Sequence, residues 1–201
     1  QVGAWLAERV DRWFGSRKAP AAGMLAGQIC RAFESSVLHD ALGDGNGLLL
    51  HWNGTAWVPR PVQPLAHDKP VLLFLHGTAS STEGSFGALH KGPGAGKLPH
   101  DFAALAASHQ LVAWEHRSLT CSPVANALGL AGALAAVLPA QPTLLHMVSH
   151  SRGGMVGDLL SIGLQPDAAV RARYGALLAG FYPEADDHPD QPLVGPLAQA
   201  L

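Results

Sequence analysis

The sequence predicts an α/β fold with a mostly parallel sheet, flanking helices and an antiparallel hairpin that opens the sheet. Short apolar runs alternate with helical patterns from residue 71 onward, which is typical of parallel strands joined by right-handed crossovers. Before them, Asn53-Gly54 separates two strand-like runs. Further along, an apolar run stops at a serine flanked by small residues, and a helical pattern follows.

The predicted strands are short apolar runs bounded by turn residues. Leu48–Trp52 and Thr55–Val58 flank Asn53-Gly54, a dipeptide that strongly favours a two-residue hairpin turn. Continuous apolar runs suit strands that are buried on both faces. We expect three such strands to be adjacent at the centre of the sheet: Val71–Leu75, Leu111–Trp114 and Thr143–Val148.

The predicted helices begin at residues that cap or initiate helices. Phe102–Ala107 follows Asp101, and Val124–Leu138 follows Ser122-Pro123. A third helix follows Ser151, because apolar residues recur there at helical spacing.

The polar segment Ala79–Lys97 is rich in Ser, Thr and Gly, and it predicts a long loop of the kind that carries function. Gly92–Lys97 looks like part of a phosphate-binding loop. However, Lys91 and Leu98 occupy positions where the motif G-x-x-x-x-G-K-[ST] has Gly and Ser or Thr. We therefore expect no nucleotide and no other cofactor.

The chain divides into an N-terminal helical segment, residues 1–42, and an incomplete α/β domain, residues 43–201. Helical spacing of apolar residues predicts helices over Trp5–Phe14 and Met24–Leu38. The C-terminal part is predicted to contain a helical stretch from Pro166 to Leu178, an acidic loop over Pro183–Pro192 and a short helix over Leu193–Leu201.

Composition argues against several classes of partner. A net charge of −2 without a Lys/Arg cluster argues against nucleic acid, and the lack of a long apolar run argues against a membrane span. Cys30 and Cys121 are the only two cysteines and lie far apart, so we expect neither a disulfide framework nor a zinc knuckle, and a cytoplasmic location. Eleven histidines contain no H-x-x-x-H spacing, so no metal site is assigned.

One stretch has the pattern of a catalytic turn. Ser149-His150-Ser151-Arg152-Gly153-Gly154 differs from the G-x-S-x-G nucleophile elbow only by Ser149 in place of the first glycine. Small residues at these positions let strand and helix approach closely. Ser151 Oγ would then be exposed at the carboxyl edge of the sheet, with the Arg152 N–H facing a developing oxyanion. The non-catalytic alternative is a tight strand-to-helix turn with a capping serine.

The order of hairpin, strand, His76-Gly77-Thr78 loop, strand and serine elbow resembles the N-terminal half of the α/β-hydrolase fold over Leu48–Leu164. In that fold, the loop after the third strand and the residue after the nucleophile supply the oxyanion N–H groups. The resemblance therefore implies that Gly77, Thr78 and Arg152 are the oxyanion residues.

Three stretches are similar to the hydrolase-like domain of bacterial proteins that carry a CHAT (caspase-like) peptidase domain. They are FLHGTASSTEGSFG, WEHRSLTCSPVANAL and HMVSHSRGGMVGDLL. This closer resemblance implies that the chain is one domain of a longer bacterial polypeptide with additional domains.

The resemblance implies a serine hydrolase of the esterase, lipase or amidase type that acts on a small-molecule ester or amide. In the family, the acid and the histidine of the triad follow the nucleophile after further strands. Only helix and loop are predicted after Ser151, and His188 is crowded by Asp186, Asp187 and Asp190, so no catalytic base is assigned.

Two functions other than hydrolysis are alternatives for such a sequence. A hydrolase-fold scaffold without turnover would serve as an interaction or sensing domain. A doubly wound nucleotide-binding domain is disfavoured, because the sequence has neither a G-x-G-x-x-G turn nor a Walker loop.

Overall fold

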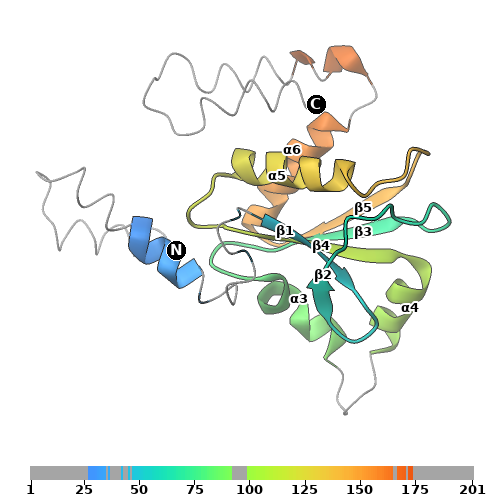
Figure 1. Ribbon diagram of the computed structural model, residues 1–201, viewed down its shortest axis with the longest axis horizontal. Helices are drawn as coiled ribbons and strands as arrows, with labels where there is room; N and C mark the ends of the chain where they lie inside the picture. The colour runs from blue at the N-terminus through green and yellow to red at the C-terminus, as the bar shows by residue number, and fades with distance from the viewer. Residues whose placement is uncertain are drawn as a thin grey trace, which may run out of the picture.

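The structure is a computed structural model that describes residues 27–34, 36, 42, 45, 47–91, 99–164, 167–170 and 172–173. These residues form a five-stranded sheet with helices on both faces (Figure 1). The strands are β1 Gly47–Trp52, β2 Trp57–Pro59, β3 Val71–Leu75, β4 Gln110–His116 and β5 Leu145–Ser149. The helices are α3 Thr82–His90, α4 His100–Ser108, α5 Pro123–Ala135 and α6 Arg152–Gly163.

The strand order is β2-β1-β4-β3-β5, and the sheet is mixed. β3 runs parallel to β4 and β5, whereas β1 runs antiparallel to β2 and β4. The α/β class is therefore confirmed, but the prediction of a mostly parallel sheet is wrong. The hairpin contributes two antiparallel pairings, because β1 pairs with β4 as well as with β2.

β5 lies at the edge of the sheet formed by the described residues, although its sequence predicts a central strand. Leu145 and Met147 pack against the core beneath α5 and α6, while His146 and Val148 are exposed. β3, in contrast, is buried at every residue. The prediction is wrong for β5 because an apolar run does not reveal whether a second neighbouring strand and a second layer of helices are present.

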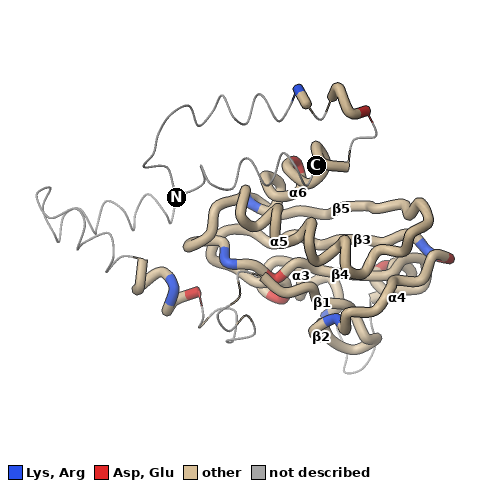
Figure 2. The backbone as a smooth tube through the Cα atoms, turned by 45° about the horizontal axis from the view of Figure 1, so that its top comes forward, with Lys and Arg blue, Asp and Glu red and all other residues tan. Residues whose placement is uncertain are grey.

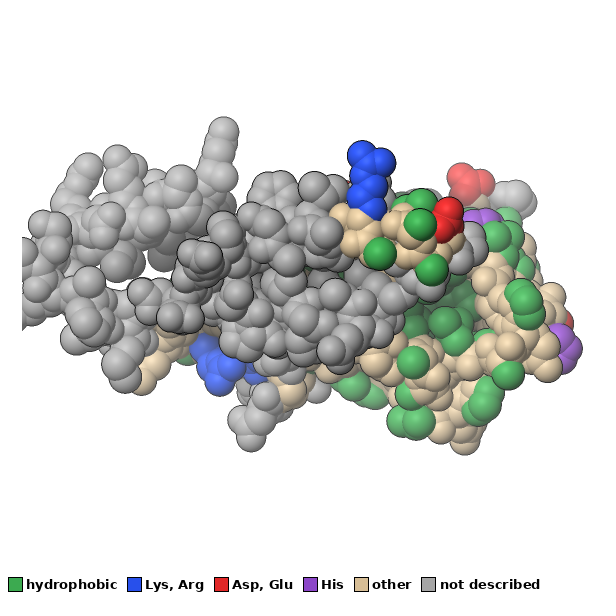
Figure 3. Space-filling view, turned by 90° about the horizontal axis from the view of Figure 1, so that it is seen from above, with side chains coloured by type: hydrophobic (Ala, Val, Ile, Leu, Met, Phe, Trp, Pro, Cys, Tyr) green, Lys and Arg blue, Asp and Glu red, His purple; other side chains and the backbone are tan. Residues whose placement is uncertain are grey.

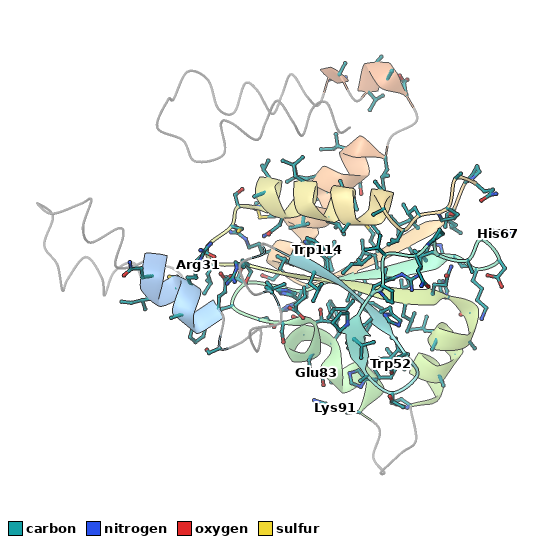
Figure 4. The ribbon with its side chains drawn as sticks, viewed as in Figure 1. Arg31, Trp52, His67, Glu83, Lys91 and Trp114 are labelled. Carbon is teal, nitrogen blue, oxygen red and sulfur yellow. The ribbon has the colours of Figure 1, made fainter. Side chains whose placement is uncertain are left out.

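Two hydrophobic cores lie on opposite faces of the sheet, one beneath α5 and α6 and the other beneath α3 and α4 (Figure 1). Successive residues of β3 divide between them. Leu73 belongs to the first core, and Phe74 packs edge-on against Phe86 of α3 in the second. Trp114 likewise belongs to the first core and Trp52 to the second, and their side chains are labelled in Figure 4.

α3 lies within the segment that was expected to be a long loop. The Ser81 side chain caps this helix by accepting a hydrogen bond from the Gly84 N–H at 2.9 Å, and Phe86 anchors it to the core. These two features outweigh the Ser and Gly content, which disfavours helix. The loop prediction is therefore wrong over Thr82–His90, while Gly92–Lys97 lies outside the described residues.

The predicted capping residue is correct for α5 and wrong for α4. α5 begins as predicted, with Ser122 accepting a hydrogen bond from the Ala125 N–H and Pro123 in the first turn. α4 begins after Pro99 without a side-chain cap, so Asp101 is not the cap that was expected. Asp101 lies in the first turn instead, where a negative charge favours the helix N-terminus.

The described part of the N-terminal segment is helical over residues 27–34 and at residue 36. Its Glu34 is 2% exposed and accepts hydrogen bonds from the Leu119 N–H and the Thr120 N–H. This carboxylate joins the helix to the loop that follows β4. The predicted helix over Trp5–Phe14 and the predicted elements after residue 178 lie outside the described residues.

Charged side chains are scattered over the described part of the tube, without a dense cluster of one sign (Figure 2). Within that part, no helix is long and apolar enough to span a membrane.

Candidate active site

Ser151 stands at the sharp turn between β5 and α6. Its backbone has φ 53° and ψ −122°, a conformation that non-glycine residues rarely adopt. The His150 N–H donates to the Leu75 carbonyl at 2.9 Å, which ties the turn to the end of β3. A strained backbone of this kind is typical of a nucleophile elbow.

Gly153 is the point at which α6 touches β3. A Cβ atom at this position would lie 2.2 Å from the Leu75 carbonyl oxygen and 2.7 Å from that of His76. Gly154 has no such constraint, since its nearest neighbour would be the Ser149 hydroxyl at 3.6 Å. A glycine at position 153, two residues after Ser151, is therefore required by the close approach of α6 and β3.

The loop between β3 and α3 brings Gly77 against the turn. A Cβ atom on Gly77 would lie 3.1 Å from the Ser151 Cβ and 2.8 Å from the His150 Nδ1. The Gly77 N–H makes a long hydrogen bond of 3.4 Å to the Ser85 hydroxyl. Thr78 is exposed, and none of the hydrogen bonds among the described residues uses its N–H. Of the two proposed loop donors, Thr78 is thus the one whose N–H makes no hydrogen bond within the described part of the chain.

The second proposed donor is the Arg152 N–H, which has no acceptor inside α6 because it is the first amide of the helix. The Arg152 side chain has a different partner. Its guanidinium donates to the Cys121 carbonyl at 2.8 Å. The backbone N–H of Arg152 is therefore free to act as a donor, while its side chain stabilises the loop after β4.

A buried polar cluster lies at the carboxyl ends of β3 and β4. His76 is fully buried, with Nε2 2.9 Å from a Glu115 oxygen and Nδ1 3.0 Å from the Gly77 carbonyl oxygen. His116 stacks on His76 with ring centroids 4.0 Å apart. Both ring nitrogens of His76 are engaged, so this histidine is not available as a base for Ser151.

Burial and, to a smaller extent, the neighbouring His76 together lower the pKa of His116 to about 3. The neutral ring donates from Nδ1 to the Trp114 carbonyl at 3.0 Å, and its Nε2 has no hydrogen-bond partner among the described residues. Such a weakly basic imidazole is a poor proton acceptor at neutral pH.

The described residues supply no catalytic base for Ser151. Ser151 is exposed, and its hydroxyl makes no hydrogen bond within the described part of the chain. Ser149 and His150 are exposed beside it. His188 and the three neighbouring aspartates lie outside the described residues.

Other potential sites are few in the described part of the chain. It contains no group of three His, Cys, Asp or Glu residues that could hold a metal ion. An open groove beside Arg31 is lined by Cys30 and Thr120, on the helix of residues 27–34 and the loop after β4, and it includes no elbow residue (Figure 4).

Exposed apolar side chains are visible on the face seen from above (Figure 3). Val148 and Met155, which flank the elbow in the sequence, are 39% and 56% exposed. Apolar side chains close to Ser151 in the sequence are thus partly exposed.

The chain matches a known family of protein domains. Residues 50–179 match a family model described as a domain of unknown function, DUF7379. The chain belongs to this family. The DUF7379 match includes the elbow, the Gly77-Thr78 loop and the whole sheet except the first residues of β1. Neither the curated proteins nor the solved structures gave a significant match to the chain.

Sequence reasoning about this DUF7379 domain missed Glu115, His116 and Ser118, all buried at the carboxyl end of β4. The available signal was the run of polar residues directly after a buried strand. In parallel sheets, this edge is where ligands and functional side chains gather.

Proposed function

We propose that this domain is a serine hydrolase of the esterase, lipase or amidase type, related to the α/β-hydrolase superfamily, with Ser151 as the nucleophile. The observation that carries the proposal is the strained backbone of Ser151 with the Gly77 loop packed against it. Such strain costs about 1–3 kcal/mol and clusters at active sites. A capping serine would not need it, and the Ser151 side chain makes no cap hydrogen bond.

In the proposed reaction, Ser151 Oγ attacks the carbonyl carbon of an ester or amide while a base removes its proton. The carbonyl oxygen becomes an oxyanion that accepts hydrogen bonds from the Arg152 and Thr78 N–H groups. Collapse of this intermediate breaks the bond to the alcohol or amine, which takes up the proton, and water then releases the acyl group from Ser151. The partly apolar surface around Val148 and Met155 suits an uncharged substrate.

The second candidate function is a hydrolase-fold scaffold without turnover, which acts by interaction or sensing. The absence of a base for Ser151 among the described residues favours it. From the resemblance to CHAT-associated proteins, we further propose that the domain works within a longer bacterial polypeptide. From the two widely separated cysteines, we propose a cytoplasmic location.

A fluorophosphonate probe on the intact polypeptide separates the two functions, because it phosphonylates activated serines. The hydrolase predicts one adduct on Ser151 that is absent from Ser151→Ala and retained in Ser108→Ala, a serine on the distant α4. An intact protein that gains no adduct would favour the scaffold.

A further inference from the structure

Glu115 joins the two ends of the loop that carries the proposed oxyanion donors. It is the penultimate residue of β4 and is 5% exposed. Its two carboxylate oxygens accept the Thr82 N–H at 3.2 and 3.0 Å. Thr82 is the first residue of α3, whose first amides have no acceptor within the helix, so a carboxylate is well suited to this position.

The same carboxylate reaches the other end of the loop. One oxygen lies 2.9 Å from Nε2 of His76, the residue before Gly77. A nitrogen and a carboxylate oxygen at this distance share one proton in a hydrogen bond, and the same nitrogen also lies 3.1 Å from the backbone nitrogen of His116. His76 in turn contacts the Gly77 carbonyl oxygen through Nδ1 at 3.0 Å. Glu115 therefore holds residues 76 and 82, and the loop spans the distance between them.

The loop itself has a shape that its own sequence does not favour. Ala79 has φ 52°, in the left-handed region that favours glycine. Its N–H donates to the hydroxyl of Ser118, a buried residue just after β4, at 2.9 Å. An alanine keeps this conformation only where the surroundings enforce it. Glu115 and Ser118, two neighbouring side chains at the end of one strand, supply that enforcement.

We propose that Glu115 is a positioning residue that fixes the Thr78 N–H beside Ser151 by bridging His76 and Thr82. The inference rests on the proposed function, because it assigns Glu115 a role in forming the oxyanion site. Glu115 does not touch the substrate position, and its influence passes through the loop backbone.

The test measures phosphonylation and amide hydrogen exchange on the same variants of the intact protein. Glu115→Ala removes both bridges. Glu115→Gln keeps an oxygen for the Thr82 N–H and an amide group beside His76, so it should restore most of the function. Glu83→Gln is the matched control. Glu83 is a half-exposed carboxylate of α3, the helix that begins at Thr82, and it pairs with His90 and Lys91 rather than with the loop (Figure 4).

We expect Glu115→Ala to lower the phosphonylation rate of Ser151 about 10²–10³-fold, the usual effect of losing one oxyanion donor. Glu115→Gln keeps both partners but loses the charge of the carboxylate, so it should label up to about tenfold more slowly than the wild type, while Glu83→Gln should label at the wild-type rate. Exchange of the Ala79 and Thr82 amides should be faster in Glu115→Ala. A wild-type labelling rate in Glu115→Ala, or a lost rate with unchanged loop exchange, would overturn the inference.

The exchange measurement separates this inference from the proposed function. If the wild-type protein gains no adduct, the proposed function fails, and loop exchange alone then decides whether Glu115 anchors the loop. Unchanged exchange at Ala79 and Thr82 in both Glu115 variants would overturn the anchoring role. If Glu115→Ala does not fold, the comparison of Glu115→Gln with Glu83→Gln decides it, with slower labelling and faster loop exchange expected only in Glu115→Gln.

Discussion

A Cβ atom on Gly153 would lie 2.2 Å from the carbonyl oxygen of Leu75, far inside van der Waals contact. Helix α6 therefore meets strand β3 through bare backbone at this point. Because the obstacle is a main-chain carbonyl of the fully buried β3, it has little freedom to move aside. The elbow geometry at Ser151 depends on this contact, since Gly153 is only two residues away.

Gly153→Ala should lower the free energy of unfolding by about 1–3 kcal/mol or more, as overpacking of a dense interior does. Gly154→Ala is the matched control. Its Cβ meets nothing closer than 3.6 Å, and alanine in a helix is favoured over glycine by about 0.5–1 kcal/mol. Urea unfolding of both variants measures the difference. Equal stabilities for the two variants would contradict the close approach.

His116 predicts a pH dependence of stability. Its folded pKa is about 3, against 6.5 for the ordinary side chain, so between these values the unfolded state binds a proton that the folded state does not. The free energy of unfolding should therefore fall by about 1.4 kcal/mol per pH unit from this group as the pH drops below 6.5.

The variant His116→Asn removes this titration and retains a donor for the Trp114 carbonyl, so its stability should fall less steeply below pH 6.5 than that of the wild type. Urea unfolding at several pH values between about 4 and about 7 measures the slope of the free energy of unfolding against pH for each variant. Parallel curves for wild type and His116→Asn would show that His116 does not carry the effect.

The thiol of Cys121 should react slowly with alkylating reagents. Burial raises its pKa, and the nearby Glu34 carboxylate raises it further. Glu34→Gln should move the pH midpoint of iodoacetamide alkylation at Cys121 downward, because a nearby negative charge that raises the pKa of this thiol is removed. Glu83→Gln serves as the control. A midpoint that stays in place in Glu34→Gln would mean that the Glu34 charge does not act on this thiol.

The 201-residue chain by itself should hydrolyse activated esters only at residual rates. A serine hydroxyl needs an adjacent base, and the described residues place none beside Ser151. An oxyanion site without a triad leaves about 10³–10⁴-fold catalysis over water. An ester assay on this chain beside Ser151→Ala checks the expectation. Turnover at ordinary esterase rates that depends on Ser151 would contradict it and point to a base such as His188.

Local patterns predicted the elements on which the candidate site is built. The hairpin, the apolar run of β3 and the serine turn were each visible because short-range chemistry determines them. The hairpin connection, however, contains the four residues between Trp52 and Trp57, so the predicted two-residue turn and the predicted strand start at Thr55 are wrong. The position of β5 at an edge was not visible, because a strand's neighbours depend on pairing between residues far apart in the sequence. Helix α3 was missed for a related reason, since Phe86 stabilises it by tertiary contact with Phe74.

Of the candidate site, the sequence predicted the serine turn and the loop after β3, but not the side chain that anchors this loop. Ser151, Arg152, Gly77 and Thr78 belong to two motifs whose geometry is local. Glu115 acts on the loop through residues 33 and 39 positions away in the chain, and no sequence pattern encodes that contact.

A crystal structure of the phosphonylated protein would test the central claim most directly. We predict a covalent adduct on Ser151 Oγ, with one phosphonyl oxygen within about 2.7–3.1 Å of both the Arg152 N–H and the Thr78 N–H. An adduct on another residue, or an oxygen on Ser151 that points to solvent away from both amides, would contradict the assignment of this turn as a nucleophile elbow with its oxyanion site.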